Sequence, residues 1–157
     1  MKFQFLALEG KSPDWVVSGR NEYVTKISGF VPLEWKSLKT PAFDREQAAA
    51  KKAKEGELLL KHFGEKDLVV LFDEKGRLAK TSEDFSTELS RVLESGKQKV
   101  CFVIGGAYGF SDEVLKRANM KGSLSPLTMN HWLAQLAALE QIYRGLTLLK
   151  GIPYHNR

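Results

Sequence analysis

The side chains best suited to chemistry stand at the end of the chain, where Tyr154 and His155 are followed by Arg157. An aromatic ring can stack on a flat ligand, an imidazole can carry a proton near neutral pH, and a guanidinium can bind an anion. Gly151 and Pro153 precede them, and these residue types end a helix and direct the chain that follows. We interpret the tail as a candidate active-site flap, with an ordinary exposed terminus as the alternative.

Arg144 is a further candidate cation, in the helix that the pattern predicts before this tail. Glu140 lies four residues earlier, the spacing at which opposite charges pair along a helix. A surface ion pair is the simplest interpretation. If Arg144 instead points at the tail, its fixed guanidinium can hold a phosphate.

Three glycines, Gly105, Gly106 and Gly109, follow a continuous apolar run at residues 100–104 and precede another predicted helix. Ligands of α/β proteins bind at such a junction, and glycines let backbone amides approach them closely. The spacing matches neither the dinucleotide fingerprint nor a P-loop. A tight turn with no ligand is therefore the alternative.

The segment before the last predicted helix is a second candidate ligand loop. It combines backbone hydrogen-bonding groups with apolar side chains, which suits a neutral aromatic ligand such as adenine. An ordinary strand-to-helix connection is the alternative. The residues of this loop are Leu124, Ser125, Pro126, Leu127, Thr128 and Met129.

The histidines and the single cysteine indicate neither a metal site nor a disulfide. His62, His131 and His155 are scattered, and no Cys or carboxylate stands at ligand spacing from them. Cys101 lies within the apolar run and is interpreted as a core residue. One cysteine allows no internal disulfide, which is typical of a reducing compartment. The chain also lacks the nucleophile-elbow motif of a Ser-His-Asp hydrolase.

The charge balance is basic, since 24 Lys and Arg against 19 Asp and Glu give a net charge of +5. An anionic partner such as RNA explains this charge, and so does solubility alone. The run at residues 51–54 is interpreted as a solvated helix face, with an RNA-facing patch as the alternative. The candidate phosphate contacts are Arg20, Lys51, Lys52 and Lys54. No apolar stretch reaches membrane length and no signal peptide is evident, so we expect a cytoplasmic protein with no membrane partner.

The candidate site residues are predicted to be positioned by alternating strands and helices. The pattern predicts strands at 2–8, 31–36, 67–73, 99–104 and 123–127, a turn at 74–76, and helices at 13–29, 44–62, 82–94, after Ser111, and at 130–149. Pro32 favours an edge strand, and Ser12 and Ser111 are predicted N-caps. The predicted class is α/β, a single domain over residues 1–157 with a mostly parallel sheet of about five strands and helices on both faces.

The last predicted helix carries a broad apolar stripe that could serve both the core and a partner subunit. The stripe consists of Trp132, Leu136, Leu139, Tyr143 and Leu146, widened by Leu133, Ala137 and Ile142.

Several segments occur together in the order of a known family. They are residues 72–76, 102–110, 124–131 with 140–144, and 153–155, and the opening Pro13-Asp14-Trp15 with Tyr23 also matches. In this order and at this length, the whole chain resembles the RlmH family. Members of that family are SPOUT-class methyltransferases that methylate N3 of a pseudouridine in large-subunit (23S) ribosomal RNA.

The resemblance implies a C-terminal trefoil knot, which the pattern alone would not suggest because knots are rare. It implies S-adenosylmethionine as the cofactor, bound by Phe72, by Gly105 and Gly106, and by the loop from Leu124 to Met129. It further implies a homodimer in which the cofactor of one subunit meets the surface of the other.

The resemblance also brings residues of the tail to the reaction. A cation, Arg144 or Arg157, would favour the anion formed when N3 loses its proton. His155 would accept or relay that proton, and Tyr154 would stack on the base or hydrogen-bond to it. The chain departs from many relatives at Ala107-Tyr108, where they have Pro-Glu, and at Asn156, which separates His155 from Arg157.

The expected substrate is ribosomal RNA within the large subunit or the assembled 70S ribosome. Two alternatives stay open at this point. One is a SPOUT methyltransferase that acts on another RNA such as tRNA. The other is a non-catalytic nucleotide- or RNA-binding α/β module.

Overall fold

The computed structural model describes residues 1–40 and 42–156, and its centre is a five-stranded sheet. The strands are β1 (Lys2–Leu8), β2 (Leu33–Leu38), β3 (Leu68–Leu78), β4 (Lys99–Ile104) and β5 (Met120–Ser123). Their spatial order is β2-β1-β4-β3-β5, and every neighbouring pair is parallel. The predicted parallel sheet of five strands is confirmed, with β2 at an edge as Pro32 indicated.

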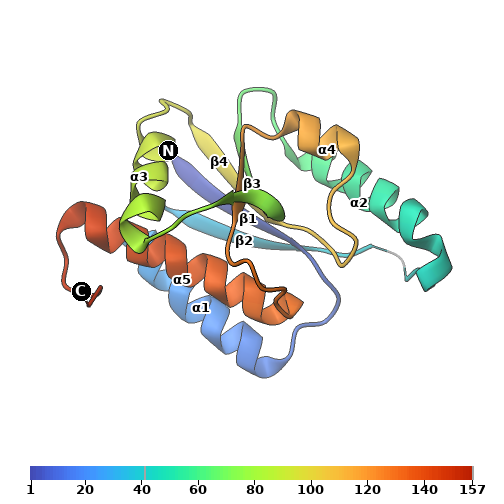
Figure 1. Cartoon of the computed structure of the whole chain (residues 1–157), viewed down its shortest axis with the longest axis horizontal. Helices are drawn as coiled ribbons and strands as arrows, with labels where there is room; N and C mark the ends of the chain where they lie inside the picture. The colour runs from blue at the N-terminus through green and yellow to red at the C-terminus, as the bar shows by residue number, and fades with distance from the viewer. Residues whose placement is uncertain (41, 157) are drawn as a thin grey trace.

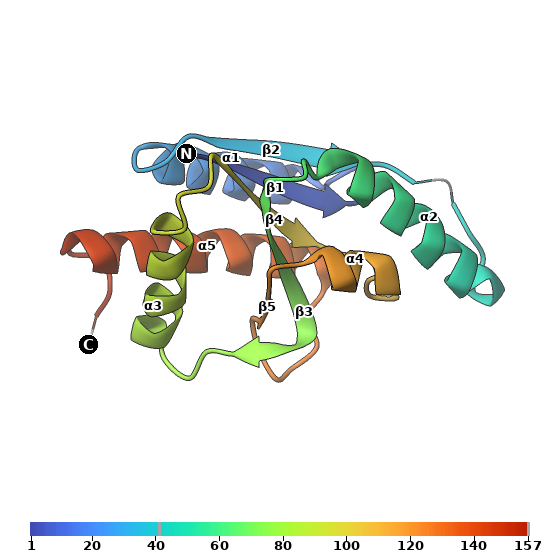
Figure 2. The same ribbon diagram turned by 90° about the horizontal axis from the view of Figure 1, so that it is seen from above.

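Helices cover both faces of this sheet, as predicted. They are α1 (Asp14–Ser28), α2 (Ala48–His62, preceded by a 3-10 turn at Arg45–Gln47), α3 (Ser82–Leu93), α4 (Asp112–Arg117) and α5 (His131–Lys150). Figure 1 shows α1, α3 and α5 on one side of the sheet and α2 and α4 on the other, and Figure 2 shows the same layers from above. No helix within residues 1–40 and 42–156 is long and apolar enough to cross a membrane.

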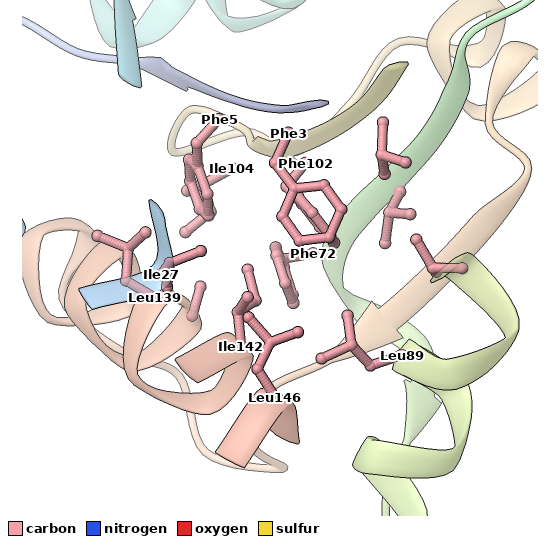
Figure 3. Packing of buried hydrophobic residues seen from close by; sticks show 14 of the residues in the cluster. Phe3, Phe5, Ile27, Phe72, Leu89, Phe102, Ile104, Leu139, Ile142 and Leu146 are labelled. Carbon is pink, nitrogen blue, oxygen red and sulfur yellow. The ribbon is translucent and has the colours of Figure 1, made fainter. Parts of the chain in front are cut away.

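The core consists of two clusters, one on each face of the sheet. Under α1, α3 and α5, the rings of Phe5, Phe72 and Phe102 stack with centroids 6.2 to 6.4 Å apart. Figure 3 shows these rings facing Leu89, Ile142 and other helix side chains. The second cluster lies under α2 and α4 and contains Cys101, which is fully buried as predicted.

One of the two predicted helix caps is confirmed and the other is wrong. The Ser111 hydroxyl accepts a hydrogen bond from the Val114 N–H at the start of α4 (3.3 Å). At α1 the N-cap residue is Pro13, and the Ser12 hydroxyl instead accepts a hydrogen bond from Arg20 (2.7 Å). The Ser12 hydroxyl, predicted to cap the helix, therefore serves as an acceptor for the Arg20 guanidinium instead.

The buried face of α5 differs from the predicted apolar stripe. Leu139, Ile142 and Leu146 are buried as expected, but Trp132, Leu136 and Tyr143 are only partly buried and Leu133 is 54% exposed. The polar residue Gln135 is fully buried at the centre of the face because its amide nitrogen donates to the buried Glu9 carboxylate. A hydrogen-bonded amide thus replaces an apolar residue in the core.

The predicted last strand is misplaced, because β5 spans Met120–Ser123 and not residues 123–127. Its short sequence carries one large apolar side chain, which gives little strand signal. Residues after Ser123 form a loop, in which the Ser125 hydroxyl accepts from the Leu127 N–H (3.0 Å). The predicted turn at 74–76 is an excursion within β3, because Phe72 and Arg77 both pair opposite Gly122.

Candidate active site

A small cavity lies at the carboxyl end of β4, beside the register shift in β3 and the loop before α5. Its volume is about 90 Å³. It is lined by Phe72, Asp73, Glu74, Ile104, Ser123, Leu124, Ser125, Leu127, Met129 and Ala134. Most of the predicted cofactor residues from β3 and from the loop before α5 are therefore brought together, whereas Pro126 and Thr128 belong to the loop but not to the lining.

The walls of the cavity differ in rigidity and in chemistry. Phe72 is fixed by its stacking on Phe102 (centroids 6.2 Å apart, rings inclined by 21°). Leu127, on the opposite wall, is 75% exposed at the tip of its loop. Asp73 and Glu74 add carboxylates at the register shift within β3. The site therefore combines an apolar slot with hydrogen-bond acceptors, which suits a flat heterocycle that carries hydroxyl or amino groups.

The glycine loop follows Ile104 directly, and the protein's own packing explains its glycines. A Cβ at Gly105 would lie 2.9 Å from the Phe110 ring, and one at Gly106 would lie 2.5 Å from Oε2 of Glu55. Gly109 has φ +79° and its N–H donates to the Gly106 carbonyl (3.2 Å), which closes the turn. Neither Gly105 nor Gly106 is among the cavity-lining residues, so their predicted contact with a cofactor stays a prediction.

The C-terminal tail folds back onto α5, and Arg144 points at it. The guanidinium Nη1 lies 3.1 Å from Nδ1 of His155, so Nδ1 is the hydrogen-bond acceptor, and the guanidinium carbon lies 4.7 Å from the Tyr154 ring centroid. The Glu140 carboxylate accepts from Nε of Arg144 and from the Tyr154 hydroxyl, both at 3.0 Å. Three of the four predicted catalytic residues thus form one cluster; the fourth, Arg157, lies outside the described residues.

Hydrogen bonds and burial fix the protonation state of two members of this cluster. The hydrogen bond to Glu140 raises the pKa of Arg144, so the guanidinium stays charged. Burial, followed by hydrogen bonds to Tyr23 and Glu140, raises the pKa of Tyr154 far above its usual value. Tyr154 is therefore a hydrogen-bond donor and not a base near neutral pH. The second nitrogen of His155, Nε2, lies 3.6 Å from Oε1 of Glu83 on α3.

The tail cluster and the cavity lie apart within one protomer. Ala134 of α5 lines the cavity, and Arg144 lies ten residues further along the same helix. At 1.5 Å per residue, this offset is about 15 Å along the helix axis. Reacting groups need to be roughly 3 to 3.5 Å apart. Arg144 therefore does not lie at the cavity of its own protomer in this structure.

The structure overturns one candidate phosphate contact. Arg20 is buried, pairs with the fully buried Glu9 carboxylate (3.0 Å) and stacks over Trp35 (4.4 Å). Its role is structural, because its guanidinium ties β1, β2 and α1 together. In the lysine run, Lys51 lies 3.8 Å from Glu55 and Lys54 lies 3.4 Å from Glu57 on the same helix.

Sequence reasoning missed the acidic residues Glu9 and Glu55 and found only part of the role of Glu140. Glu140 was recognised only as the helix partner of Arg144, and its second bond, to Tyr154, needs the folded tail. Glu9 directly follows the apolar strand β1 and Glu55 lies in a lysine-rich stretch of α2, and no spacing in the sequence marks either side chain as buried. Within the described residues, no group of three or more His, Cys, Asp or Glu side chains could hold a metal ion.

Comparison with known proteins identifies the class to which this fold and site belong. The family model described as "Predicted SPOUT methyltransferase" matches residues 1–155. The chain therefore belongs to the SPOUT methyltransferase family. A solved structure described as a hypothetical protein has the same fold, with a TM-score of 0.54 and 15% identity over 94% of this chain and 68% of that one.

Curated relatives narrow the comparison within the family. The chain is 45% identical, over 99% of both lengths, to ribosomal RNA large subunit methyltransferase H of Bdellovibrio bacteriovorus. It is 41% identical, over 86% of both lengths, to the protein of the same name from Christiangramia forsetii. The resemblance drawn from the motifs is thereby confirmed over the full length of the chain.

Proposed function

We propose that this protein is a single-domain methyltransferase, residues 1–157, that transfers a methyl group from S-adenosylmethionine to N3 of a pseudouridine in 23S ribosomal RNA. The names of its full-length relatives support large-subunit ribosomal RNA as the substrate. The proposed place of action is the assembled ribosome in the cytoplasm. The net charge of +5 favours an anionic partner.

The cavity residues fit this cofactor. Phe72, Leu127 and Met129 supply apolar walls for an adenine, and the backbone of the loop from Leu124 to Met129 supplies hydrogen-bond partners. When bound, the cofactor supplies the methyl group of a sulfonium. A volume of about 90 Å³ is smaller than the roughly 300 Å³ or more of ordinary ligand sites, so the exposed loop at Leu127 must shift outward on binding.

The observation that carries the proposal is the separation of the tail cluster from the cavity. Both contain residues that the family resemblance implies, yet within one protomer Arg144 lies about 15 Å along α5 from the cavity-lining Ala134. A homodimer resolves this, since a two-fold axis can place the tail of one subunit at the cavity of its partner. Trp15 on α1 and Leu133 on α5, 53% and 54% exposed, offer apolar surface for such an interface.

The tail residues then have distinct roles at the partner's cavity. Arg144, held charged by Glu140, favours the anionic form of the uracil ring, and Arg157 adds a second cation. His155 accepts the N3 proton, and Tyr154 donates a hydrogen bond or stacks on the base. Before His155 can accept this proton, one of its ring nitrogens must lose its present partner. Arg144 donates to Nδ1, and Glu83 faces Nε2. The C-terminal trefoil knot implied by the resemblance is part of the proposal.

The test is a methylation assay with methyl-labelled S-adenosylmethionine and ribosomes that lack the modification, followed by identification of the labelled nucleoside. We expect label in N3-methylpseudouridine of 23S RNA. Label in another nucleoside, or in tRNA, would replace the proposed target by a different RNA. Failure to bind the cofactor at all would leave a non-catalytic RNA-binding module.

A further inference from the structure

A buried acidic side chain lies against the glycine loop. Glu55 is on α2, and the residue is only 3% exposed. The backbone N–H of Gly106 lies near its carboxylate and lowers the pKa of Glu55. A Cβ at Gly106 would come within 2.5 Å of its Oε2. The carboxylate of Glu55 therefore fills the space that a side chain at Gly106 would need.

The neighbouring residue on α2 holds the other end of the same loop. A Cβ at Gly56 would lie 2.3 Å from the Ser111 hydroxyl oxygen, so the helix backbone is pressed against the N-cap of α4. Gly106 and Ser111 bracket the loop that leaves β4. Two consecutive residues of α2, Glu55 and Gly56, thus contact both ends of the glycine loop.

The carboxylate of Glu55 is a poor choice if its only task is to stabilise the fold. Burial raises its pKa, and the nearby Lys51 (Nζ to Oε1 3.8 Å) and the Gly106 N–H offset that effect only in part. An apolar side chain would fill the same place without the cost of desolvating a charge. The contact with the loop backbone is what an apolar residue could not provide.

We infer that Glu55 is a positioning residue that holds the backbone of Gly106, two residues after the cavity-lining Ile104, so that the glycine loop is in place before S-adenosylmethionine binds. This inference rests on the proposed function, because the cofactor is the one proposed above. Glu55 is not among the residues that line the cavity, so it acts through Gly106. A loop that is already ordered costs less free energy to bind than one that must be ordered.

The first test compares Glu55→Met with Glu55→Gln in the full chain, by calorimetric titration with S-adenosylmethionine. Met has a similar volume but no carboxylate to face the Gly106 N–H, and we expect the Kd for S-adenosylmethionine to be about tenfold weaker. Gln keeps an acceptor for the Gly106 N–H, and we expect a Kd within about threefold of the wild type. The thermal midpoint should not fall in either variant, because neither carries a buried charge.

A second measurement needs no cofactor. Hydrogen exchange of the Gly106 amide should be faster in Glu55→Met than in the wild type and unchanged in Glu55→Gln. If the wild-type protein binds no S-adenosylmethionine, the proposed function fails, but this measurement still decides the contact. If Glu55→Met binds like the wild type and its Gly106 amide stays protected, the inference is wrong.

A double-mutant cycle tests the steric half of the inference. Gly106→Ala places a Cβ against the carboxylate in the wild type, but into vacated space in Glu55→Ala. We therefore expect Gly106→Ala to weaken cofactor binding less in the Glu55→Ala background. Strictly additive losses would show that the two positions do not share this space and would overturn the inference.

Discussion

If each active site combines the cavity of one subunit with the tail of the other, two inactive variants should complement each other in a heterodimer. Ala134→Phe puts a phenyl ring into a cavity of about 90 Å³ and should block the cofactor, whereas His155→Ala disables the tail. Each homodimer should be inactive: the first binds no cofactor, and the second loses the roughly hundredfold or more that a general base supplies. In a heterodimer of the two variants, a site shared between subunits pairs one intact cavity with one intact tail.

One site of the heterodimer contains both lesions and the other contains neither, so the heterodimer should have about half of the wild-type activity per dimer. The two variants are co-expressed with different affinity tags, and the heterodimer is isolated and assayed for methyl transfer to ribosomes. Circular dichroism and the thermal midpoint check that Ala134→Phe folds. A heterodimer as inactive as both homodimers would show that each protomer works alone and would refute the reasoning.

The remaining predictions concern single residues. His155→Ala should lower kcat for methyl transfer but leave the Kd for S-adenosylmethionine unchanged; equal losses in both would remove His155 from the chemistry. Glu9→Ala should destabilise the protein by about 3 kcal/mol or more in chemical unfolding, because it strands the buried Arg20 charge; a loss below about 1 kcal/mol would contradict this. Burial raises the pKa of the Cys101 thiol to about 11. At pH 8 about one molecule in a thousand then carries the reactive thiolate, so alkylation of the native protein should be very slow and should accelerate as the pH approaches 11. Rapid labelling at pH 8 without unfolding would contradict the burial.

Much of the sheet could be predicted because buried parallel strands leave continuous apolar runs, as residues 68–72 and 100–104 do. β5 could not, because Met120–Ser123 owes its place to pairing with β3 and not to its own side chains. The burial of a charged residue was likewise not predictable from its own segment of sequence. Arg20 is a single charge on a helix, which looks exposed in sequence, and only the three-dimensional structure shows Glu9 beside it.

The candidate site was predictable where it consists of consecutive residues and not where it depends on packing between elements. The loop from Leu124 to Met129 could be recognised as one stretch, and much of it lines the cavity. The orientation of Arg144 toward His155 depends on how the tail folds back after Gly151, for which the sequence offered only the turn. Glu55 contacts Gly106 across the interior, and no local pattern records such a pair.

The strand order has a consequence for how the chain is made. β4 is inserted between β1 and β3, and Phe3 pairs opposite Val100. During synthesis β1 emerges first and can pair with β2, but its other edge has no partner until residues 99–104 have left the exit tunnel. A nascent chain halted before that point exposes the apolar strand β1 along one open edge, which is the form that chaperones bind or that aggregates. The central strand β4 can therefore join β1 to β3 only after the second half of the chain has been translated.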